Sequence, residues 1–335
     1  MGRQIVFNIG IIGCGLIGLK RSKSLGLRGK LIACADKNIN RAKKIAKNKK
    51  IKFFSDWRKL LELNKIDIVI ISTPHNQLSK ILLYAHKRKK HILVEKPASK
   101  NFKEINKVIS RTKNTKNKIR VGFNHRYHPS IIKAQQIIKS GIIGKPMYLR
   151  ARYGHGGRLG YENEWRAKPL VSGGGELIDQ GSHVIDLSRF FLGEFNDIKG
   201  FLNTYFYNMS VEDNAFMTLK TKNNKIAFLH VSWTEWKNMF SFEIFCRLGK
   251  IDINGIGGSY GREQLTLYKM SKKMGVPKQK KWKFNIKDMS WTNEINEFYD
   301  DILYNRKPIP NLNDAYQTHK IINKIYKNSK YDNFS

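Results

Sequence analysis

The first 123 residues alternate between short, continuous apolar runs and longer segments whose apolar residues recur at helical spacing. Apolar runs of this length are typical of parallel strands that are buried on both faces. The runs are NIGII (8–12), KLIACAD (30–36), IDIVIIST (66–73), HILVE (91–95) and IRVGF (119–123). Segments with helical spacing lie between them, for example at 77–90 and 102–112. This alternation predicts a doubly wound parallel sheet, a Rossmann domain, over residues 1–123.

A different pattern begins after Phe123. Segments 129–141 and 176–193 have the spacing of amphipathic helices, and 147–154 alternates like a strand. Further predicted strands follow at 199–208, 213–221, 225–235, 240–255 and 263–270, and two helices at 293–304 and 313–329. Successive strands predict a mainly antiparallel sheet. The predicted fold class is therefore α/β, with a second α/β domain over 124–335 whose C-terminal helix is a candidate to pack back on the first domain.

The composition fits two globular domains. The chain has 335 residues, 41% of them hydrophobic, and no apolar run near the roughly 18 residues that cross a bilayer. The N-terminus lacks the pattern of a cleaved signal peptide. Three cysteines, Cys14, Cys34 and Cys246, are an odd number without metal-ligand spacing. These features predict a cytoplasmic protein with reduced thiols and no metal site.

The formal net charge of +37 comes from 63 Lys and Arg against 26 Asp and Glu. Such a field attracts nucleic acid, anionic lipid or a phosphorylated substrate. The lysines are scattered along the whole chain, which favours a solvated basic surface, with an anionic small molecule as the second interpretation. No nucleic-acid-binding motif is visible. We therefore expect a small-molecule partner rather than nucleic acid or a membrane.

Glycines at positions 13, 15 and 18 follow the first strand with the GxGxxG spacing of a dinucleotide-binding turn. Gly13 makes the tight turn, Gly15 lets the backbone approach a pyrophosphate, and Gly18 lets helix and strand pack closely. The phosphate then lies against the free N–H groups at the start of the helix, at Leu16 and Ile17. The turn predicts a bound dinucleotide.

Asp36 ends the second predicted strand, eighteen residues after Gly18. A carboxylate there accepts hydrogen bonds from the ribose hydroxyls and repels a 2′-phosphate, so the expected cofactor is NAD. Lys37 and Arg41 follow and suit a phosphate, which leaves NADP open. Cys14, inside the turn, is expected to be a small apolar filler.

Ligands of doubly wound sheets bind beyond the carboxyl ends of the strands. The candidates at those ends are Ser72, Thr73, Pro74, His75, Glu95, Lys96 and Pro97. Lys96 differs from its many neighbours because it precedes a proline at the end of an apolar run, which constrains its backbone. We expect it to be held in place rather than solvated.

A second group of candidates lies on the predicted helix at 176–193. Asp179 and His183 are four residues apart and Asp186 is three beyond, so all three share one face. A carboxylate one turn before a histidine orients the imidazole and stabilises its charged form. The glycine-rich connection before this helix is a candidate specificity loop, with Tyr153, His155, Arg158 and Tyr161.

Together these motifs resemble the Gfo/Idh/MocA oxidoreductases, a family named after glucose-fructose oxidoreductase and inositol dehydrogenase. The resemblance runs through nearly the whole chain, in IGIIGCGLIG, STPHNQL, LVEKP, VGFNHRYHP, EWRAKP, GGGELIDQGSHVIDL and NEINEFYDDILYNRKPIP. It implies a Rossmann domain followed by an α/β domain with a large open sheet, which often forms the dimer interface. The implied assembly is a homodimer or homotetramer.

The resemblance also implies roles for residues. Lys96, Asp179 and His183 match the lysine and the Asp-x-x-x-His pair that line the substrate site of the family. Arg126, in FNHRYHP, and the pair Trp165 and Arg166 are implied near the substrate or the cofactor. For Asp186 we expect a supporting role.

Two narrower features refine this resemblance. Many members have a histidine three residues after the strand-end turn, where this chain has Leu78; its own histidine, His75, adjoins Pro74. The segments TPHNQL, FNHRYHP and YGHGGRLGYENEWR resemble a subgroup associated with bacterial surface-polysaccharide and nucleotide-sugar pathways.

The implied activity is hydride transfer between a sugar or nucleotide-sugar carbinol and nicotinamide. His183 is the expected base, Lys96 the donor to the same oxygen, and Asp179 the residue that raises the basicity of His183; which of Lys96 and His183 takes the proton stays open. Two alternatives remain: an epimerase or reductase that recycles its own cofactor, and a regulatory NAD-binding protein without turnover.

Overall fold

The computed structural model describes residues 5–47, 50–113, 115–284, 287–329 and 331. The chain divides into two compact units. The first comprises Met1–Phe123 with Trp291–Tyr316, and the second Asn124–Ser290 with Gln317–Ser335. The first segment of the first unit ends at residue 123, and residues 291–316 also join this unit. Within the described part of the chain, no helix is long and apolar enough to cross a membrane.

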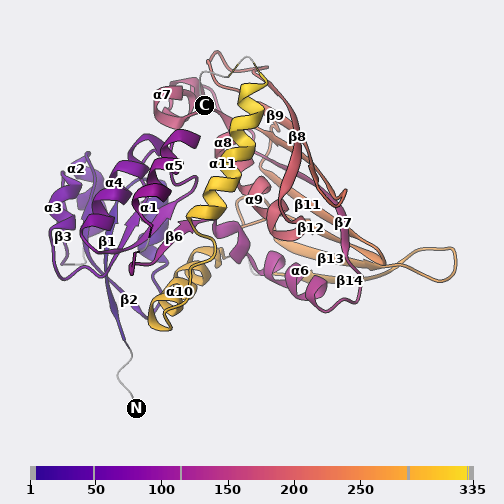
Figure 1. The fold of residues 1–335 in the computed structure, drawn as a ribbon, viewed down its shortest axis with the longest axis horizontal. Helices are drawn as coiled ribbons and strands as arrows, with labels where there is room; N and C mark the ends of the chain where they lie inside the picture. Colours follow the sequence, from indigo (N-terminus) through magenta and orange to yellow (C-terminus); the bar gives the residue numbers. More distant parts are fainter. Residues whose placement is uncertain (1–4, 48–49, 114, 285–286, 330, 332–335) are drawn as a thin grey trace. The chain divides into compact units, whose positions relative to one another are not determined.

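The first unit contains a six-stranded sheet in the order β3-β2-β1-β4-β5-β6, with every pair parallel (Figure 1). Its strands are β1 (Phe7–Ile12), β2 (Gly29–Ala35), β3 (Lys52–Phe54), β4 (Ile68–Ile71), β5 (His91–Glu95) and β6 (Ile119–Gly122). Its helices are α1 (Leu16–Lys23), α2 (Ile39–Ala46), α3 (Trp57–Leu61), α4 (His75–Lys87), α5 (Phe102–Arg111) and α10 (Ser290–Leu303). The predicted doubly wound sheet is therefore confirmed.

Both faces of this sheet are covered, which explains the continuous apolar runs. In β4, Ile68 and Ile70 pack into one core and Val69 and Ile71 into the other. The first core also contains Phe298 and other residues of α10. Because α10 buries its apolar face on the parallel sheet, the segment around it belongs with the first unit.

The second unit contains an eight-stranded sheet in the order β14-β13-β12-β11-β7-β10-β9-β8. Only β7 and β10 among these neighbours pair in parallel; the other pairs are antiparallel. The strands are β7 (Pro146–Gly154), β8 (Phe195–Asn203), β9 (Asn214–Thr221), β10 (Ile226–Ser232), β11 (Met239–Cys246), β12 (Gly249–Asn254), β13 (Gln264–Lys269) and β14 (Lys278–Lys283). The mainly antiparallel second sheet is thus confirmed.

One face of the eight-stranded sheet packs on helices, and the other, the open face, carries side chains that are partly or fully exposed. Along β11, Phe240, Phe242 and Ile244 are buried while the residues between them are partly exposed. The core beneath includes residues of α6 (Pro129–Lys139), α9 (Gly181–Leu192) and α11 (Leu312–Lys327). The open face carries exposed aromatic side chains, among them Phe201 and Phe228.

Two predicted elements differ in the structure. The strand expected over 199–208 ends at Asn203, because the Asp213 carboxylate accepts the N–H groups of Tyr205, Phe206 and Tyr207 and draws them away from the ladder. The helix expected over 176–193 is divided into α8 (Glu176–Asp179) and α9. At the division, the N–H group of His183 donates to the Gln180 carbonyl oxygen at 3.0 Å, a tighter turn than an α-helix makes.

Candidate active site

The glycine turn after β1 has room only for glycine at positions 13 and 18. Gly13 has a φ of +91°, and a Cβ there would lie 2.5 Å from the Ser72 carbonyl oxygen. A Cβ on Gly18 would lie 1.9 Å from the Gly13 carbonyl oxygen. A Cβ on Gly15, in contrast, would meet nothing within 4 Å. The turn is therefore tightly packed against its own sheet but open at Gly15, where a ligand can approach the backbone.

The N-terminus of α1 beside this turn suits an anion. Gly15 precedes the helix and supplies no side-chain cap, and the first turn contains no acidic residue. Leu16, the first helical residue, is 70% exposed. Uncapped N–H groups at a helix N-terminus and the positive end of its dipole attract phosphate. These residues therefore fit the pyrophosphate of a dinucleotide.

Asp36 is fixed at the end of β2. Its Oδ2 atom accepts the Cys14 N–H at 2.7 Å, and its Oδ1 atom accepts the Asn38 N–H at 2.8 Å. The carboxylate is therefore oriented by the turn that it adjoins, and it remains partly exposed to bind a hydroxyl group. Lys37 and Arg41, the candidates for a 2′-phosphate, are both exposed.

The ends of β4 and β5 lie at the same edge of the sheet as the turn, since β1, β4 and β5 are neighbouring parallel strands. The Ser72 hydroxyl donates to the Gly13 carbonyl oxygen at 2.8 Å. Thr73 follows it, and Pro74 and His75 begin α4, with the His75 side chain buried. Lys96 comes directly after β5 and is half-buried, and it joins Pro97 through a cis peptide bond.

The Glu95 side chain forms a buried ion pair and does not face open space. The Arg21 guanidinium lies 2.6 Å from Glu95 Oε1 and 2.6 Å from Glu294 Oε2, and all three side chains are buried. Burial raises the pKa of Glu294, and the neighbouring Glu95 carboxylate acts in the same direction. The ion pair ties α1, which begins at the glycine turn, to the strand that ends at Lys96.

In the second unit, Asp179 and Asp186 each pair with an arginine. Arg166 Nε donates to Asp179 Oδ2 at 2.8 Å. Arg126 donates to both oxygens of Asp186, at 2.7 and 2.6 Å, and this pair is buried. The sequence marked Arg126 as a substrate contact, whereas in the structure its guanidinium makes this bidentate pair. Trp165 lies against the Arg166 guanidinium, 4.6 Å from it.

His183 lies between these two carboxylates along the helix and stacks on His125. The ring centroids are 3.7 Å apart and the planes are inclined by 19°. Tyr153 packs against the same rings, 5.3 Å from His125 and 6.4 Å from His183. The structure therefore brings together two of the residues expected from sequence, His183 and Tyr153, with one that was not expected, His125.

The glycine-rich connection adds a histidine with a defined orientation. His155 Nδ1 accepts the Gly157 N–H at 3.0 Å, so the neutral ring carries its proton on Nε2. Burial lowers the pKa of His155, which keeps the ring neutral. Its ring lies 5.6 Å from that of Tyr161. Arg158 turns instead to Glu164, with which it forms an ion pair.

Two further polar residues face this group: Gln180, from the segment GGGELIDQGSHVIDL, and Tyr260, which lies outside the quoted motifs. Gln180 Nε2 donates to the Tyr260 hydroxyl at 2.9 Å, and the Tyr260 ring lies 4.9 Å from that of Tyr153. Burial raises the pKa of Tyr260 to about 12, so the hydroxyl keeps its proton at neutral pH.

Among the residues that the sequence analysis missed, His125 had a signal in the sequence, because it adjoins Arg126 in FNHRYHP. Tyr260 had none, since it lies far along the chain.

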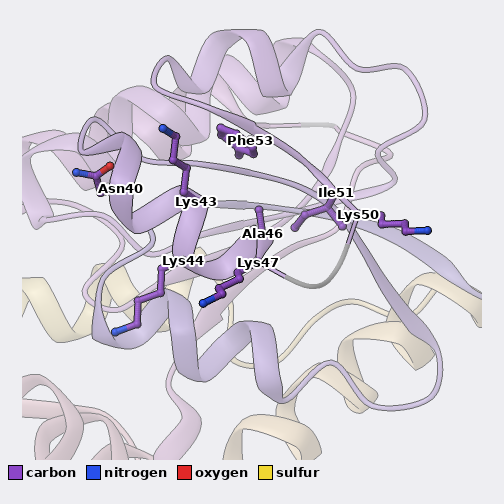
Figure 2. A pocket seen from close by; sticks show the side chains of 8 residues that line it. All are labelled: Asn40, Lys43, Lys44, Ala46, Lys47, Lys50, Ile51 and Phe53. Atoms are coloured by element: carbon purple, nitrogen blue, oxygen red, sulfur yellow. The ribbon is translucent and has the colours of Figure 1, made fainter.

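A cavity of about 530 Å³ on the first unit lies elsewhere, along α2 and β3. Its lining includes Asn40, Phe53 and four lysines, Lys43, Lys44, Lys47 and Lys50 (Figure 2). Figure 2 shows the Lys50 ammonium pointing away from those of the other three. The lysines therefore do not converge on one ligand. Among the described residues, no three His, Cys, Asp or Glu side chains are grouped as a metal site would require.

Two family models match the two units separately. The oxidoreductase family with an NAD-binding Rossmann fold matches residues 7–123, and the GFO/IDH/MocA C-terminal domain matches residues 131–252. Both belong to one family, and together they account for most of the chain.

Individual relatives are similar over part of their length. The chain is 31% identical over 153 residues to levoglucosan dehydrogenase of Pseudarthrobacter phenanthrenivorans, which covers 45% of this chain and 39% of that protein. It is 28% identical over 193 residues to myo-inositol 2-dehydrogenase of Thermotoga maritima, covering 56% of this chain and 55% of that protein. The matches thus span about two fifths and about half of these relatives.

A solved structure shares the fold of the whole chain. It is levoglucosan dehydrogenase in complex with NADH and levoglucosan, which matches with a TM-score of 0.88 and 22% identity over 98% of both chains. The glycine turn and the oriented Asp36 agree with the two family models. The chain belongs to the Gfo/Idh/MocA family of oxidoreductases, with the family's NAD-binding Rossmann fold in its first unit and the family's C-terminal domain in its second.

Proposed function

We propose that this protein is an NAD-dependent dehydrogenase that transfers a hydride between a carbinol carbon of a sugar or related polyol and nicotinamide. The observation that carries the proposal is the carboxyl edge of the parallel sheet. There the open Gly15 turn, the oriented Asp36 and the half-buried Lys96 follow β1, β2 and β5, which are strands of one parallel sheet. This is the arrangement that a dinucleotide and a reacting hydroxyl group require.

The bound nicotinamide would supply the carbon that gains or loses the hydride. The first-unit residues proposed to hold the cofactor are Gly13, Gly15, Leu16, Ile17, Gly18, Asp36, Lys37, Ser72, Thr73, Pro74, His75, Glu95 and Lys96. The second-unit pair Trp165 and Arg166 is proposed to contact it as well. Glu95 acts in this proposal through its pairing with Arg21, which fixes the backbone next to Lys96.

Oxidation of an alcohol also requires that the hydroxyl proton leave, so a base must reach the oxygen. His183 is the proposed base, because the Asp179 carboxylate lies one turn before it on the same segment and its ring is held by the stack with His125. Lys96 is proposed to donate to the same oxygen and stabilise its developing negative charge. Tyr153, His155 and Arg126 complete the proposed substrate-binding set, Arg126 through its hold on Asp186.

The substrate class in this proposal is a sugar or a nucleotide sugar. The relatives named above act by name on levoglucosan and myo-inositol, both small polyols. A role in making sugars for bacterial surface polysaccharides is the narrowest form of the proposal, and it rests on the TPHNQL, FNHRYHP and YGHGGRLGYENEWR segments alone. The three cysteines are unbridged thiols, which supports a reducing compartment such as the cytoplasm.

We also propose that the open face of the eight-stranded sheet joins copies of the chain into a homodimer or homotetramer. Phe201 is 79% exposed on this face and Phe228 is 52% exposed. Exposed aromatic residues grouped on one sheet face are typical of a subunit interface. Light scattering of the purified protein measures the oligomeric state and tests this proposal.

The decisive experiment for activity is a substrate panel. The purified protein is incubated with NAD or NADP and with levoglucosan, myo-inositol, uronic acids or nucleotide sugars, and reduced nicotinamide is followed by its absorbance. Reduction by one member establishes the dehydrogenase and its substrate class. If NAD binds but no member reduces it, the proposal fails in favour of the regulatory or cofactor-recycling alternatives.

A further inference from the structure

Glu212 is a fully buried carboxyl group in the second unit, two residues before β9. Three successive backbone N–H groups point to it. Those of Gly175 and Leu177 donate to its Oε1 atom at 3.1 and 3.0 Å, and that of Glu176 donates to its carbonyl oxygen at 3.0 Å. One residue from a distant part of the chain therefore caps the N-terminus of α8.

This cap matters because α8 has only four residues and no cap of its own. Gly175 precedes the helix and has no side chain to accept a hydrogen bond. Buried N–H groups at a helix start are costly when they lack acceptors. Asp179 is the last residue of α8, and His183 lies on the next turn. The position of Glu212 consequently fixes where the segment with both candidate residues begins.

The neighbourhood of Glu212 is closely fitted. The Tyr326 hydroxyl of α11 donates to the same Oε1 atom at 2.8 Å. A Cβ on Gly174 would lie 1.9 Å from that hydroxyl, and a Cβ on Gly175 would lie 2.0 Å from the Glu212 carbonyl oxygen. At both glycines a side chain would collide with Glu212 or Tyr326, and at Gly174 the φ of +151° also favours glycine.

We infer that Glu212 is a positioning residue for the Asp179–His183 pair: its carboxyl group holds the start of α8 and, through α8, the two side chains proposed for proton transfer. Its catalytic consequence rests on the proposed function. The hydrogen bonds themselves require only an acceptor at Oε1, so glutamine, which keeps that acceptor, is the conservative replacement.

Hydrogen exchange of the full-length protein tests this inference directly. The variants are Glu212→Ala, Glu212→Gln and Tyr326→Phe, with Glu243→Ala as the control, since Glu243 is a partly exposed carboxylate of β11. We expect exchange of amides 175–183 to be about tenfold faster or more in Glu212→Ala. It should be close to the original in Glu212→Gln and Glu243→Ala, and raised in Tyr326→Phe.

The same variants are then assayed for turnover. Glu212→Ala should lower kcat at least about tenfold while the affinity for NAD, which most of the proposed cofactor residues bind from the first unit, changes less, and Glu212→Gln should retain kcat. If Glu212→Ala does not fold, the comparison of Glu212→Gln, with exchange close to the original, and Tyr326→Phe, with raised exchange, decides.

Equal exchange in all variants, or a Glu212→Gln variant as impaired as Glu212→Ala, would overturn the inference. A wild-type protein without turnover on any substrate would overturn the proposed function, and with it the catalytic part of this inference. The exchange data would then still decide whether Glu212 holds α8.

Discussion

The imidazole rings of His125 and His183 stack on each other in the second unit, 3.7 Å apart between centroids. His125 belongs to the short 3-10 helix η1 (Asn124–Tyr127), and its neighbour Arg126 pairs with Asp186, three residues after His183. Two successive residues of η1 thus contact two residues of α9 that lie about one helical turn apart. This double contact orients the ring that we propose as the base.

We predict that His125→Ala lowers kcat about tenfold or more, because His183 loses the surface that holds its ring. His125→Phe keeps an aromatic ring to stack on and should retain most of the activity. The measurement is steady-state kinetics with the substrate found in the panel, and His86→Ala, a histidine of α4, is the control. Equal activity of the Ala and Phe variants would show that the stack has no role in positioning.

The buried Arg21–Glu95–Glu294 ion pairs should be costly to break. Arg21→Met leaves two buried carboxylates without their cation, so we expect a loss of about 3–5 kcal/mol in the free energy of unfolding. Arg28→Met removes a partly exposed pair with Asp300 and should cost less than about 1 kcal/mol. Urea unfolding of the two variants provides the comparison, and similar losses in both would contradict the prediction.

Asp36 should set the choice between the two nicotinamide cofactors. Asp36→Ala removes the acceptor for the ribose hydroxyls and the repulsion of a 2′-phosphate, so the ratio of Kd for NADP to Kd for NAD should fall about tenfold or more. Asp67→Ala is the matched control, since Asp67 also accepts a backbone N–H, that of Asn8. Titration by fluorescence measures both constants. An unchanged ratio in Asp36→Ala would remove Asp36 from the cofactor site.

The buried carboxyl group of Glu212 should also make the stability of the protein depend on pH. Burial raises the pKa of this carboxyl group to about 7, although Tyr326 and the backbone N–H groups of Leu177 and Gly175 oppose the shift. Between about pH 4.5 and pH 7 the folded state then holds a proton that the unfolded state has lost, so stability falls as pH rises. The contribution is on the order of 3 kcal/mol.

The pH dependence is measured by urea unfolding at several pH values in the original protein and in Glu212→Gln. The stability of the glutamine variant should fall less over this range, since it has no group to ionise. Parallel curves for the two proteins would mean that another group titrates.

The first unit was predictable because its information is local. Each strand of the parallel sheet, such as β4 and β5, is a continuous apolar run, and each glycine of the turn has a fixed spacing from β1. The assignment of α10 to the first unit was harder to predict. The sequence of an amphipathic helix does not indicate which sheet its apolar face will contact. Contacts in the folded chain decide this, among them those of Phe298 and Tyr299 with the core of the first unit.

Residues of the candidate site could be predicted from sequence where they lie in a motif. They could not be predicted where segments that are distant in the sequence come together. Lys96, Asp179 and His183 each lie in a recognisable motif, but their role remains a prediction. Glu212, Tyr260 and the Arg21–Glu294 pair lie outside the quoted motifs or far apart in sequence, so no spacing links them to a site. Their partners become visible only when the chain is folded.

The measurement that tests the central claim most directly compares Lys96→Ala and His183→Ala with Lys103→Ala, an exposed lysine of α5 as control. Turnover with the substrate identified in the panel and the Kd for NAD are determined on the same samples. The account predicts that the first two variants lose a factor of about 10²–10³ or more in kcat, whereas the Kd for NAD changes far less than kcat and the control keeps its activity. Full activity of Lys96→Ala would contradict it.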